Sequence, residues 1–338
     1  MIDLPWLLGD QWAISIEDLQ EAATIAKLVI VAPIGCDRGE SIEGACRRRG
    51  TRSVALLFRD YLVDYSPLQR RQLADNRWDV VDVEDCESSQ FVRLLREILA
   101  EVDVSDPVLI DITGLPMPAL AMLVRILLEK NIQNVTWIYA EPHQYLGGAS
   151  TEFATGLQSV SPLRGFAAQP EDGDEGAFVV LAGYDSAALR AVADYRKGAK
   201  PRYLVIPFPP LQAQMYQEGI LRIQEVRDSL LVDAGDNARG VRVPAFDAWG
   251  TVEALASLFG RSDGRVFSVA PLSTKPQTLG VFLWWSRLSP EQRAQVSIIA
   301  PRYARLQFRV SEGTGRIWKY RLYPRILGRD PVIAGKSA

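Results

Sequence analysis

The feature that most constrains how this chain can fold is an order of strands and helices that occurs twice. An apolar strand at 27–33 leads through a helical stretch to a second strand at 53–58. An apolar strand at 178–183 leads in the same way to a strand at 203–208. Short apolar strands that alternate with helices of roughly ten or more residues are typical of a parallel sheet with helices on both faces.

The correspondence continues along both halves of the chain. The strand and helix at 78–99 match those at 241–259, and the strands and helix at 108–142 match those at 266–301. Because these matches come in the same order, we predict an α/β fold of two tandem Rossmann-like parallel-sheet domains related by internal duplication. Each half is expected to hold about five strands.

The repeat also predicts the division of the chain. We expect an N-terminal extension at 1–26, a first Rossmann-like domain at 27–150 and a second at 178–338 that includes a basic C-terminal end. The extension is predicted to be helical at 15–26. Between the domains we expect a linker at 151–177, because its last part is acidic, rich in glycine and without periodicity.

Charge and length narrow the class of protein. The 338 residues carry a net charge of -3, so the overall balance gives no sign of nucleic-acid wrapping. The C-terminal end is basic. Its lysines and arginines include Arg305, Arg309, Arg316, Lys319, Arg321, Arg325 and Arg329. This end is either a contact for nucleic acid or phosphate, or a solvated basic face.

Several other classes are disfavoured by what the sequence lacks. The three cysteines have no C-x-x-C spacing, which fits reduced thiols better than a disulfide framework. No apolar run reaches the roughly 18 residues of a membrane helix. The start of the chain has no basic region typical of a signal peptide. We therefore expect a cytoplasmic protein with no membrane partner.

Motifs for catalysis and cofactors are missing as well. His143 is the single histidine, and no G-x-S-x-G precedes it. No G-x-G-x-x-G follows either first strand, and no Walker A loop is present. We expect no cofactor, no metal and no catalytic residue of these types.

The first candidate ligand-binding corner follows the strand at 108–111. Asp111, Thr113 and Gly114 lie where this strand meets a helix that begins near Pro116. Ligands of open parallel sheets bind outside the carboxyl ends of the strands, where helix N-termini favour anions. Gly114 either lets a backbone approach a ligand or adopts a positive φ. The alternative is a plain capped turn.

The second half has a matching corner. Ser273 and Thr274 supply hydroxyls, Lys275 a positive charge and Gln277 an amide. Hydroxyls and a lysine at a helix N-terminus suit an anion, and Lys275 is the expected main contact. The alternative is an N-cap with an exposed lysine.

Four further residues at strand ends are candidate ligand contacts: Tyr139, Glu141, Asp185 and Tyr303. Arg38 and Tyr184 also follow first strands. For the tyrosines, packing at a sheet edge is the competing interpretation.

The segment "LIDITGLPMPALAMLVRILLEKNIQNVTWIYAEP" at 109–142 resembles the hallmark segment of CARF domains, the CRISPR-associated Rossmann folds. There a strand ends in a D-x-T-G-G-T-K-like corner, a helix follows, and the next strand carries an aromatic residue. This chain lacks the second glycine and the T-K pair. Its second corner has Ser273, Thr274 and Lys275 but lacks the aspartate and the glycine.

SAVED domains, which look like two fused CARF units, are similar in their doubled architecture. The resemblance implies a CARF-like and SAVED-like sensor of a cyclic oligonucleotide or related nucleotide, serving antiphage defence. Its output would come from a separate effector chain, because no effector segment accompanies it.

Three hypotheses follow: a nucleotide-sensing or regulatory subunit, a ring nuclease or other phosphodiesterase that degrades the signal, and a non-catalytic scaffold. We also predict that the two halves superpose with Pro116 over Pro276. Because CARF-like units place their ligand corners across a two-fold axis, the resemblance also implies that the corners at 114–116 and 273–276 face a shared cleft within one chain.

Overall fold

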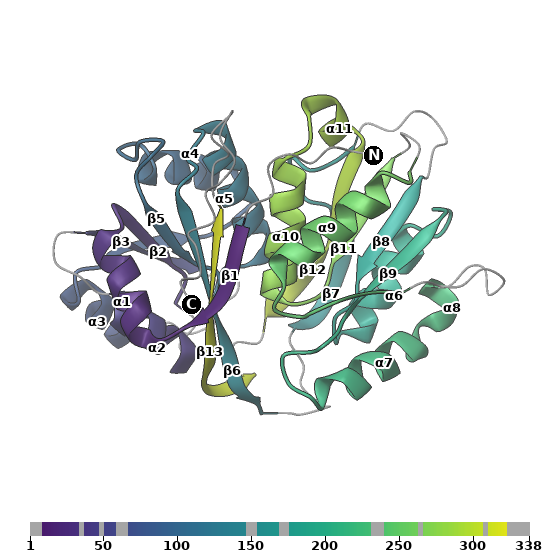
Figure 1. Ribbon diagram of the computed structural model, residues 1–338, viewed down its shortest axis with the longest axis horizontal. Helices are drawn as coiled ribbons and strands as arrows, with labels where there is room; N and C mark the ends of the chain where they lie inside the picture. The colour runs from purple at the N-terminus through teal and green to yellow at the C-terminus, as the bar shows by residue number, and fades with distance from the viewer. Residues whose placement is uncertain are drawn as a thin grey trace, which may run out of the picture.

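The computed structural model forms two α/β halves that lie side by side (Figure 1). It describes residues 9–33, 37–46, 51–58, 67–146, 154–168, 176–230, 240–262, 266–306 and 310–322. Most of the glycine-rich part of the expected linker, and the basic residues Arg309, Arg325 and Arg329, lie outside these ranges.

The first sheet has seven strands in the order β1-β13-β6-β5-β2-β3-β4. Their bounds are β1 Gly9–Ile14, β2 Leu28–Val31, β3 Arg52–Phe58, β4 Asp79–Val83, β5 Val108–Asp111, β6 Val135–Tyr145 and β13 Ser311–Leu322. The five strands from β6 to β4 are parallel; the central strands β2 and β5 are buried along their whole length, whereas the edge strand β4 is mostly half-exposed. At one edge β13 pairs antiparallel with β6, and β1 pairs antiparallel with β13 and so runs in the same direction as the five.

The second sheet has six strands in the order β10-β9-β8-β11-β12-β7. Their bounds are β7 Ala154–Pro162, β8 Ala177–Leu181, β9 Arg202–Pro207, β10 Val241–Val243, β11 Phe267–Pro271 and β12 Val296–Leu306. Five of them are parallel, and β7 runs antiparallel to β12.

Helices connect the parallel strands. Those of the first half are α1 Ile16–Ile25, α2 Asp37–Cys46, α3 Pro67–Asp75, α4 Ser89–Ile98 and α5 Met117–Glu129. Those of the second half are α6 Ser186–Tyr195, α7 Met215–Glu225, α8 Arg227–Leu230, α9 Ala248–Phe259, α10 Lys275–Ser286 and α11 Pro290–Ala294. None of these described helices has the length and apolar character that crossing a membrane requires.

The two halves have the same strand order. When the parallel strands of each half are numbered along the chain, both sheets run 3-2-1-4-5, followed by one antiparallel strand beside the fifth. This agrees with the two Rossmann-like domains expected from the repeat. A shared origin of the halves by duplication remains an inference from this order.

The antiparallel strands are exchanged between the halves. β7 follows β6 along the chain, but it pairs with β12 of the second sheet. β13 follows β12, but it pairs with β6 of the first sheet. The segment expected to be a linker therefore contributes a strand to the second sheet. The end of the expected second domain likewise belongs to the first sheet, where β1 of the N-terminal extension pairs with it.

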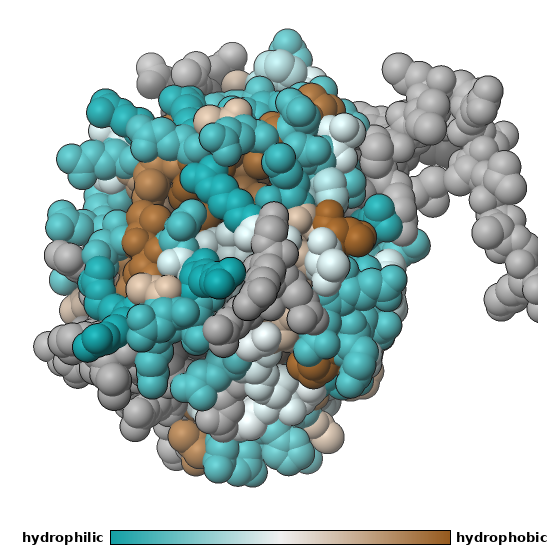
Figure 2. Space-filling model, turned by 90° about the vertical axis from the view of Figure 1, so that its left-hand side faces the viewer, coloured by the Kyte–Doolittle hydropathy of each residue, from teal (hydrophilic) through white to brown (hydrophobic). Residues whose placement is uncertain are grey.

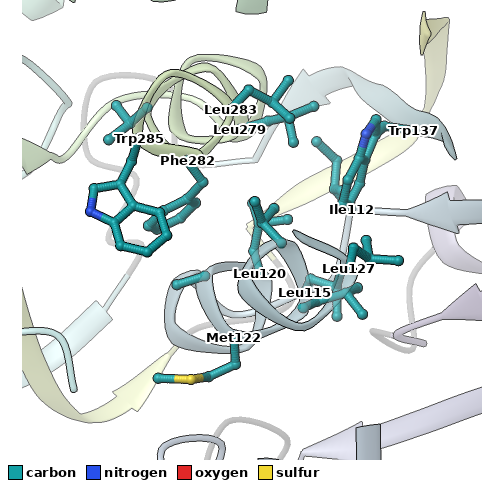
Figure 3. Close-up of a cluster of buried hydrophobic side chains, with 14 of the residues drawn as sticks. Ile112, Leu115, Leu120, Met122, Leu127, Trp137, Leu279, Phe282, Leu283 and Trp285 are labelled. Carbon is teal, nitrogen blue, oxygen red and sulfur yellow. The ribbon is translucent and has the colours of Figure 1, made fainter. Parts of the chain in front are cut away.

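A hydrophobic core joins the halves through α5 and α10, whose side chains face each other (Figure 3). Leu120 of α5 and Phe282 of α10 are both fully buried. Phe166, which follows β7, packs against Phe282 and against Trp285, with ring centroids 5.6 and 4.4 Å apart. Because this core belongs to both halves, their burial energies are not independent.

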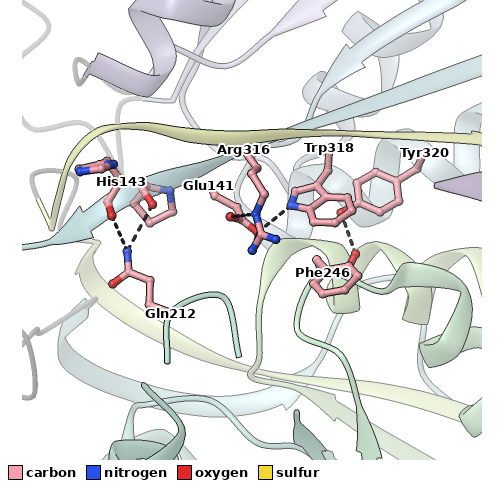
Figure 4. Close-up of polar contacts among 8 residues, drawn as sticks. Glu141, His143, Gln212, Phe246, Arg316, Trp318 and Tyr320 are labelled. Atoms are coloured by element: carbon pink, nitrogen blue, oxygen red, sulfur yellow. Dashed lines mark hydrogen bonds and ion pairs between the residues drawn. The ribbon is translucent and has the colours of Figure 1, made fainter. Parts of the chain in front are cut away.

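A second set of contacts joins the β6–β13 edge to the second half (Figure 4). The Trp318 ring stacks on Phe246 with centroids 4.3 Å apart. The Tyr320 hydroxyl donates to the Phe246 carbonyl at 2.8 Å, and the Gln212 amide donates to the His143 carbonyl at 2.9 Å. On the side of the molecule at the left of Figure 1, hydrophilic residues make up most of the surface, with hydrophobic ones between them (Figure 2).

Candidate functional site

The two corners are in direct contact, whereas the expected cleft between them stays a prediction. Lys275 is the first residue of α10, and its Nζ donates a hydrogen bond to the Leu115 carbonyl in the first-half corner. The local sequence sets this direction. Thr274 caps the helix with an extended backbone, and Pro276 occupies an early helical position that suits proline. Lys275 therefore leaves the helix start toward the other half.

A chain of hydrogen bonds fixes the first corner. The Thr113 backbone N–H donates to Asp111 Oδ1 at 2.9 Å, and Thr113 Oγ1 accepts from the Ala140 N–H at 2.9 Å. The Ala140 carbonyl in turn accepts from Arg38 Nη1 at 3.1 Å. These bonds tie the ends of β5 and β6 to the start of α2, so the first corner is a rigid arrangement.

We use the name central cluster for the side chains that are joined by these hydrogen bonds or by electrostatic interactions with them. Its members are Arg38, Glu43, Asp111, Thr113, Tyr139, Tyr145 and Lys275. Asp111 is 2% exposed and Arg38 is 8% exposed. Within the described part of the chain, Arg38 Nε has no hydrogen-bond partner, which leaves one donor of a buried cation unused. Other buried side-chain atoms, such as Nε1 of Trp137 and of Trp249, also lack a partner among the described residues, so the unused donor of Arg38 marks a candidate site only together with the charges around it.

The position of the cluster follows from the strand order. The order 3-2-1-4-5 reverses between the first and fourth strands, which are β2 and β5 in the first half. Ligands of open α/β sheets bind beside this switch point at the carboxyl ends of the strands. Arg38 follows β2, and Asp111 ends β5.

The environment makes the Lys275 amine easier to deprotonate than an ordinary lysine. Burial, and then the Arg38 cation, lower the pKa of Lys275 to about 8, although Cys86 and Asp111 act in the opposite direction. At neutral pH the amine is still mostly protonated, so the cluster presents two cations, one from each half.

The carboxyl groups of the cluster have raised pKa values. Burial raises the pKa of Asp111 to about 6, although hydrogen bonds from Thr113 and the charges of Arg38 and Lys275 oppose the shift. Burial, and then repulsion by Asp111, raise the pKa of Glu43 to about 7. The net charge of the cluster therefore changes within the physiological range of pH.

Tyrosines from both halves lie near these charges. Burial is the main cause that raises the pKa of Tyr139 and Tyr145 above the ordinary value, and Arg38 acts on both. Burial and the nearby Tyr145 raise the pKa of Tyr184, which belongs to the second half. All three phenols are therefore protonated at neutral pH.

In the second half, the predicted ligand residues at the strand ends bond mainly to the protein itself. Asp185 caps α6 through a hydrogen bond from the Ala188 N–H at 2.9 Å, and it accepts from the Tyr303 hydroxyl at 2.6 Å. Gln277 is fully buried and donates to the Val243 carbonyl at 3.0 Å. These contacts position helices and strands.

The hydroxyls of the second corner differ from each other. Thr274 Oγ1 accepts from the Gln277 N–H and donates to the Ala245 carbonyl, so it is occupied as a helix cap. Among the described residues, the buried Oγ of Ser273 and the buried Oε1 of Gln277 have no hydrogen-bond partner.

The structure also bears on two further predicted residues, Glu141 and Gly114. The Glu141 carboxylate accepts from Arg316 Nε at 3.0 Å and from Trp318 Nε1 at 2.6 Å, so it holds β13 against β6 (Figure 4). Positive φ values occur at other described glycines, and Gly114 is not one of them. Of the two interpretations of this glycine, the positive φ is therefore excluded, and the close approach of its backbone to a ligand stays a prediction.

Sequence reasoning noted Arg38 but did not select it, and it missed Glu43 and Tyr145. The position of Arg38 after the first strand of the half was a usable signal. Glu43 lies inside α2, and Tyr145 lies at the far end of β6. Their nearness to Asp111 and Arg38 depends on long-range packing, which no local pattern reports.

The basic C-terminal end is only partly described. Arg316 is paired with Glu141, and Lys319 lies over the Trp12 ring at 5.3 Å. Among the described residues, no group of three or more histidines, cysteines, aspartates or glutamates is arranged to hold a metal ion. Cys46 and Cys86 are buried cysteines.

No protein-family model matches the sequence, and its comparison with curated proteins gave no significant match.

Proposed function

We propose that this protein is a nucleotide-sensing or regulatory subunit whose central cluster binds a phosphate of its ligand. The observation that carries the proposal is that two cations from different halves bond to one corner region: Arg38 donates to the Ala140 carbonyl, Lys275 donates to the Leu115 carbonyl, and the Arg38 charge acts on the Lys275 amine. A buried cation with an unused donor and a second cation at a helix N-terminus favour an anion.

The resemblance to CARF and SAVED domains extends the proposal to the ligand and the setting. On that basis the ligand is a cyclic oligonucleotide or a related nucleotide, and the setting is a prokaryotic antiphage defence system in the cytoplasm. The signal passes to a separate effector chain. The buried tyrosines beside the cations offer hydroxyl donors and ring faces for the rest of a nucleotide.

A panel titration tests this function. Purified protein is titrated calorimetrically with cyclic dinucleotides, cyclic tri- and tetranucleotides and their linear forms, at two salt concentrations. We expect at least one nucleotide to bind, with an affinity that falls as salt rises. Chromatography of the recovered nucleotide shows whether it is returned intact, as sensing requires, or cleaved, as a ring nuclease requires.

The variant Lys275→Ala tests the site. Because a hydrogen bond to a charged group contributes about 1.5–3 kcal/mol, we expect binding to weaken roughly 10- to 150-fold. Lys197→Ala is the matched control, since Lys197 is exposed and lies in the connection between the end of α6 and the start of β9. Equal weakening in both variants, or none in Lys275→Ala, contradicts this site.

A non-catalytic scaffold is the second candidate. Several predicted ligand residues, namely Glu141, Thr274, Asp185 and Tyr303, spend their hydrogen bonds on holding the protein together. If no nucleotide of the panel binds to the wild-type protein, this candidate replaces the sensor.

A further inference from the structure

The antiparallel strand beside the fifth parallel strand is paired on its far side in one half and not in the other. In the first sheet this strand is β13, and β1 pairs along its outer edge. In the second sheet the equivalent strand is β7, and β12 is the one described strand that pairs with it. Half of the backbone groups of an antiparallel edge strand point away from its partner, so β7 presents N–H and C=O groups along its outer edge.

The middle of β7 is open to solvent. Gly156, Gln158 and Ser159 are exposed, whereas Trp318 and Tyr320 of the equivalent strand β13 are buried. Another strand can therefore reach the middle of β7 from solvent.

Charge and length distinguish β7 from the other edge strands of the described sheets. β1 carries Asp10, β4 carries Asp79 and Asp82, and β10 carries Arg242. These strands have six, five and three residues, against nine in β7, and none of the nine residues of β7 is charged. Natural edge strands are commonly protected from further pairing by shortness or by charge, and β7 has neither protection.

β7 does contain a bulge. Its register with β12 shifts where Ser159 pairs with Arg302 and Leu157 pairs with Tyr303, so Gln158 is the extra residue. A bulge increases the local twist of a strand. Residues on both sides of Gln158 still pair with β12, so β7 keeps two short stretches that another strand can extend.

We propose that the outer edge of β7 is an interface with a second copy of this chain, in which the two β7 strands pair antiparallel across a two-fold axis. Two-fold dimers are the commonest oligomers, and each uses the same surface patch on both copies. Because β7 carries no charge, no register of this pairing brings like charges together, whereas pairing of β4 with its own copy would oppose aspartates. The pairing joins the six-stranded sheets of the two copies into one continuous sheet. This inference does not rest on nucleotide sensing.

Size-exclusion chromatography with light scattering, on the full-length protein over a wide range of concentration, tests the inference. We expect the mass to rise with concentration from 37.6 kDa toward twice that value. Hydrogen exchange at the lowest and highest concentrations locates the interface, because the amides of β7 should gain protection while those of β4 and β10 do not. A mass of 37.6 kDa at every concentration overturns the inference and leaves this edge to a strand of another protein.

A lysine in β7 tests the edge itself. In Gln158→Lys each copy brings a positive charge to the middle of the paired strands, so the dimer should weaken at least about tenfold. The melting temperature of the monomer should stay close to that of the wild type, since Gln158 is exposed. Gln224→Lys, the same substitution at an exposed position of α7, is the matched control and should dimerise like the wild type.

Ser159→Lys repeats the test at the neighbouring exposed position, in case Gln158→Lys does not fold. Wild-type dimerisation in a folded lysine variant of β7 overturns the inference. Concentration-dependent protection that is confined to other strands has the same meaning, because it places the dimer interface elsewhere.

Discussion

Glu43 and Asp111 are carboxyl groups that act on each other in a largely buried part of the first half. For an acid whose pKa is higher in the folded than in the unfolded protein, the folded state is favoured when the group is protonated. As pH rises past the unfolded value, the unfolded chain releases its proton first. The folded protein therefore loses stability until the pH passes the folded pKa.

We predict that Glu43→Gln stabilises the protein at alkaline pH and has little effect at acid pH. The pKa of Glu43 is raised from 4.5 to about 7, so the difference in free energy of unfolding between the variant and the wild type should develop as the pH rises through this range. The free energy of unfolding should rise by roughly 1–3 kcal/mol at about pH 8. Urea denaturation at both ends of this range measures the difference.

Glu97→Gln is the control for this prediction. Glu97 lies exposed on α4, where removing its charge should leave the pH profile of stability unchanged. A wild-type advantage over Glu43→Gln that grows with pH has the opposite sign and contradicts the shift.

At the scale of secondary-structure elements, α5 and α10 decide whether the halves act as one unit. Phe282→Ala should lower the free energy of unfolding by about 3–5 kcal/mol, because the ring is fully buried between them. We also expect fluorescence and circular dichroism to report one shared unfolding transition. Leu128→Ala, at an exposed position of α5, should cost far less. Two separate transitions in the wild-type protein mean that the shared core does not couple the halves.

The elements differ in how far the sequence announces them. β5 and α5 are recognisable because a run of apolar residues ends at Asp111 and a proline precedes the helix. β7 was hidden, since it is a half-exposed antiparallel strand with glycine and polar residues, and its partner β12 is far along the chain. β1 was hidden for the same reason.

The candidate site shows the same limit. The repeat, together with the resemblance to CARF units, predicted that the corners of Asp111 and Lys275 would lie near one another. It gave no information on the side-chain bonds that occupy Asp185 and Glu141. Those bonds depend on Tyr303 and Arg316, which lie more than a hundred residues away along the chain.

At the scale of the whole molecule, the exchanged strands predict an unequal response to truncation. Ending the chain after Leu306 removes β13 but keeps all six strands of the second sheet. We expect the amides of β1 and β6 to lose protection in hydrogen exchange, while those of β8 and β11 keep theirs. Unchanged protection in β1 contradicts the prediction, and so does equal loss in both sheets.

The exchange of strands also means that paired strands are synthesised at very different times. β1 leaves the ribosome well before its neighbour in the described sheet, β13, because most of the described chain lies between them. At about 5–20 residues per second, β1 waits on the order of tens of seconds for its partner. During that interval the edge of β6 that later pairs with β13 is unpaired in the nascent chain. A chaperone or a second nascent chain can bind to this edge.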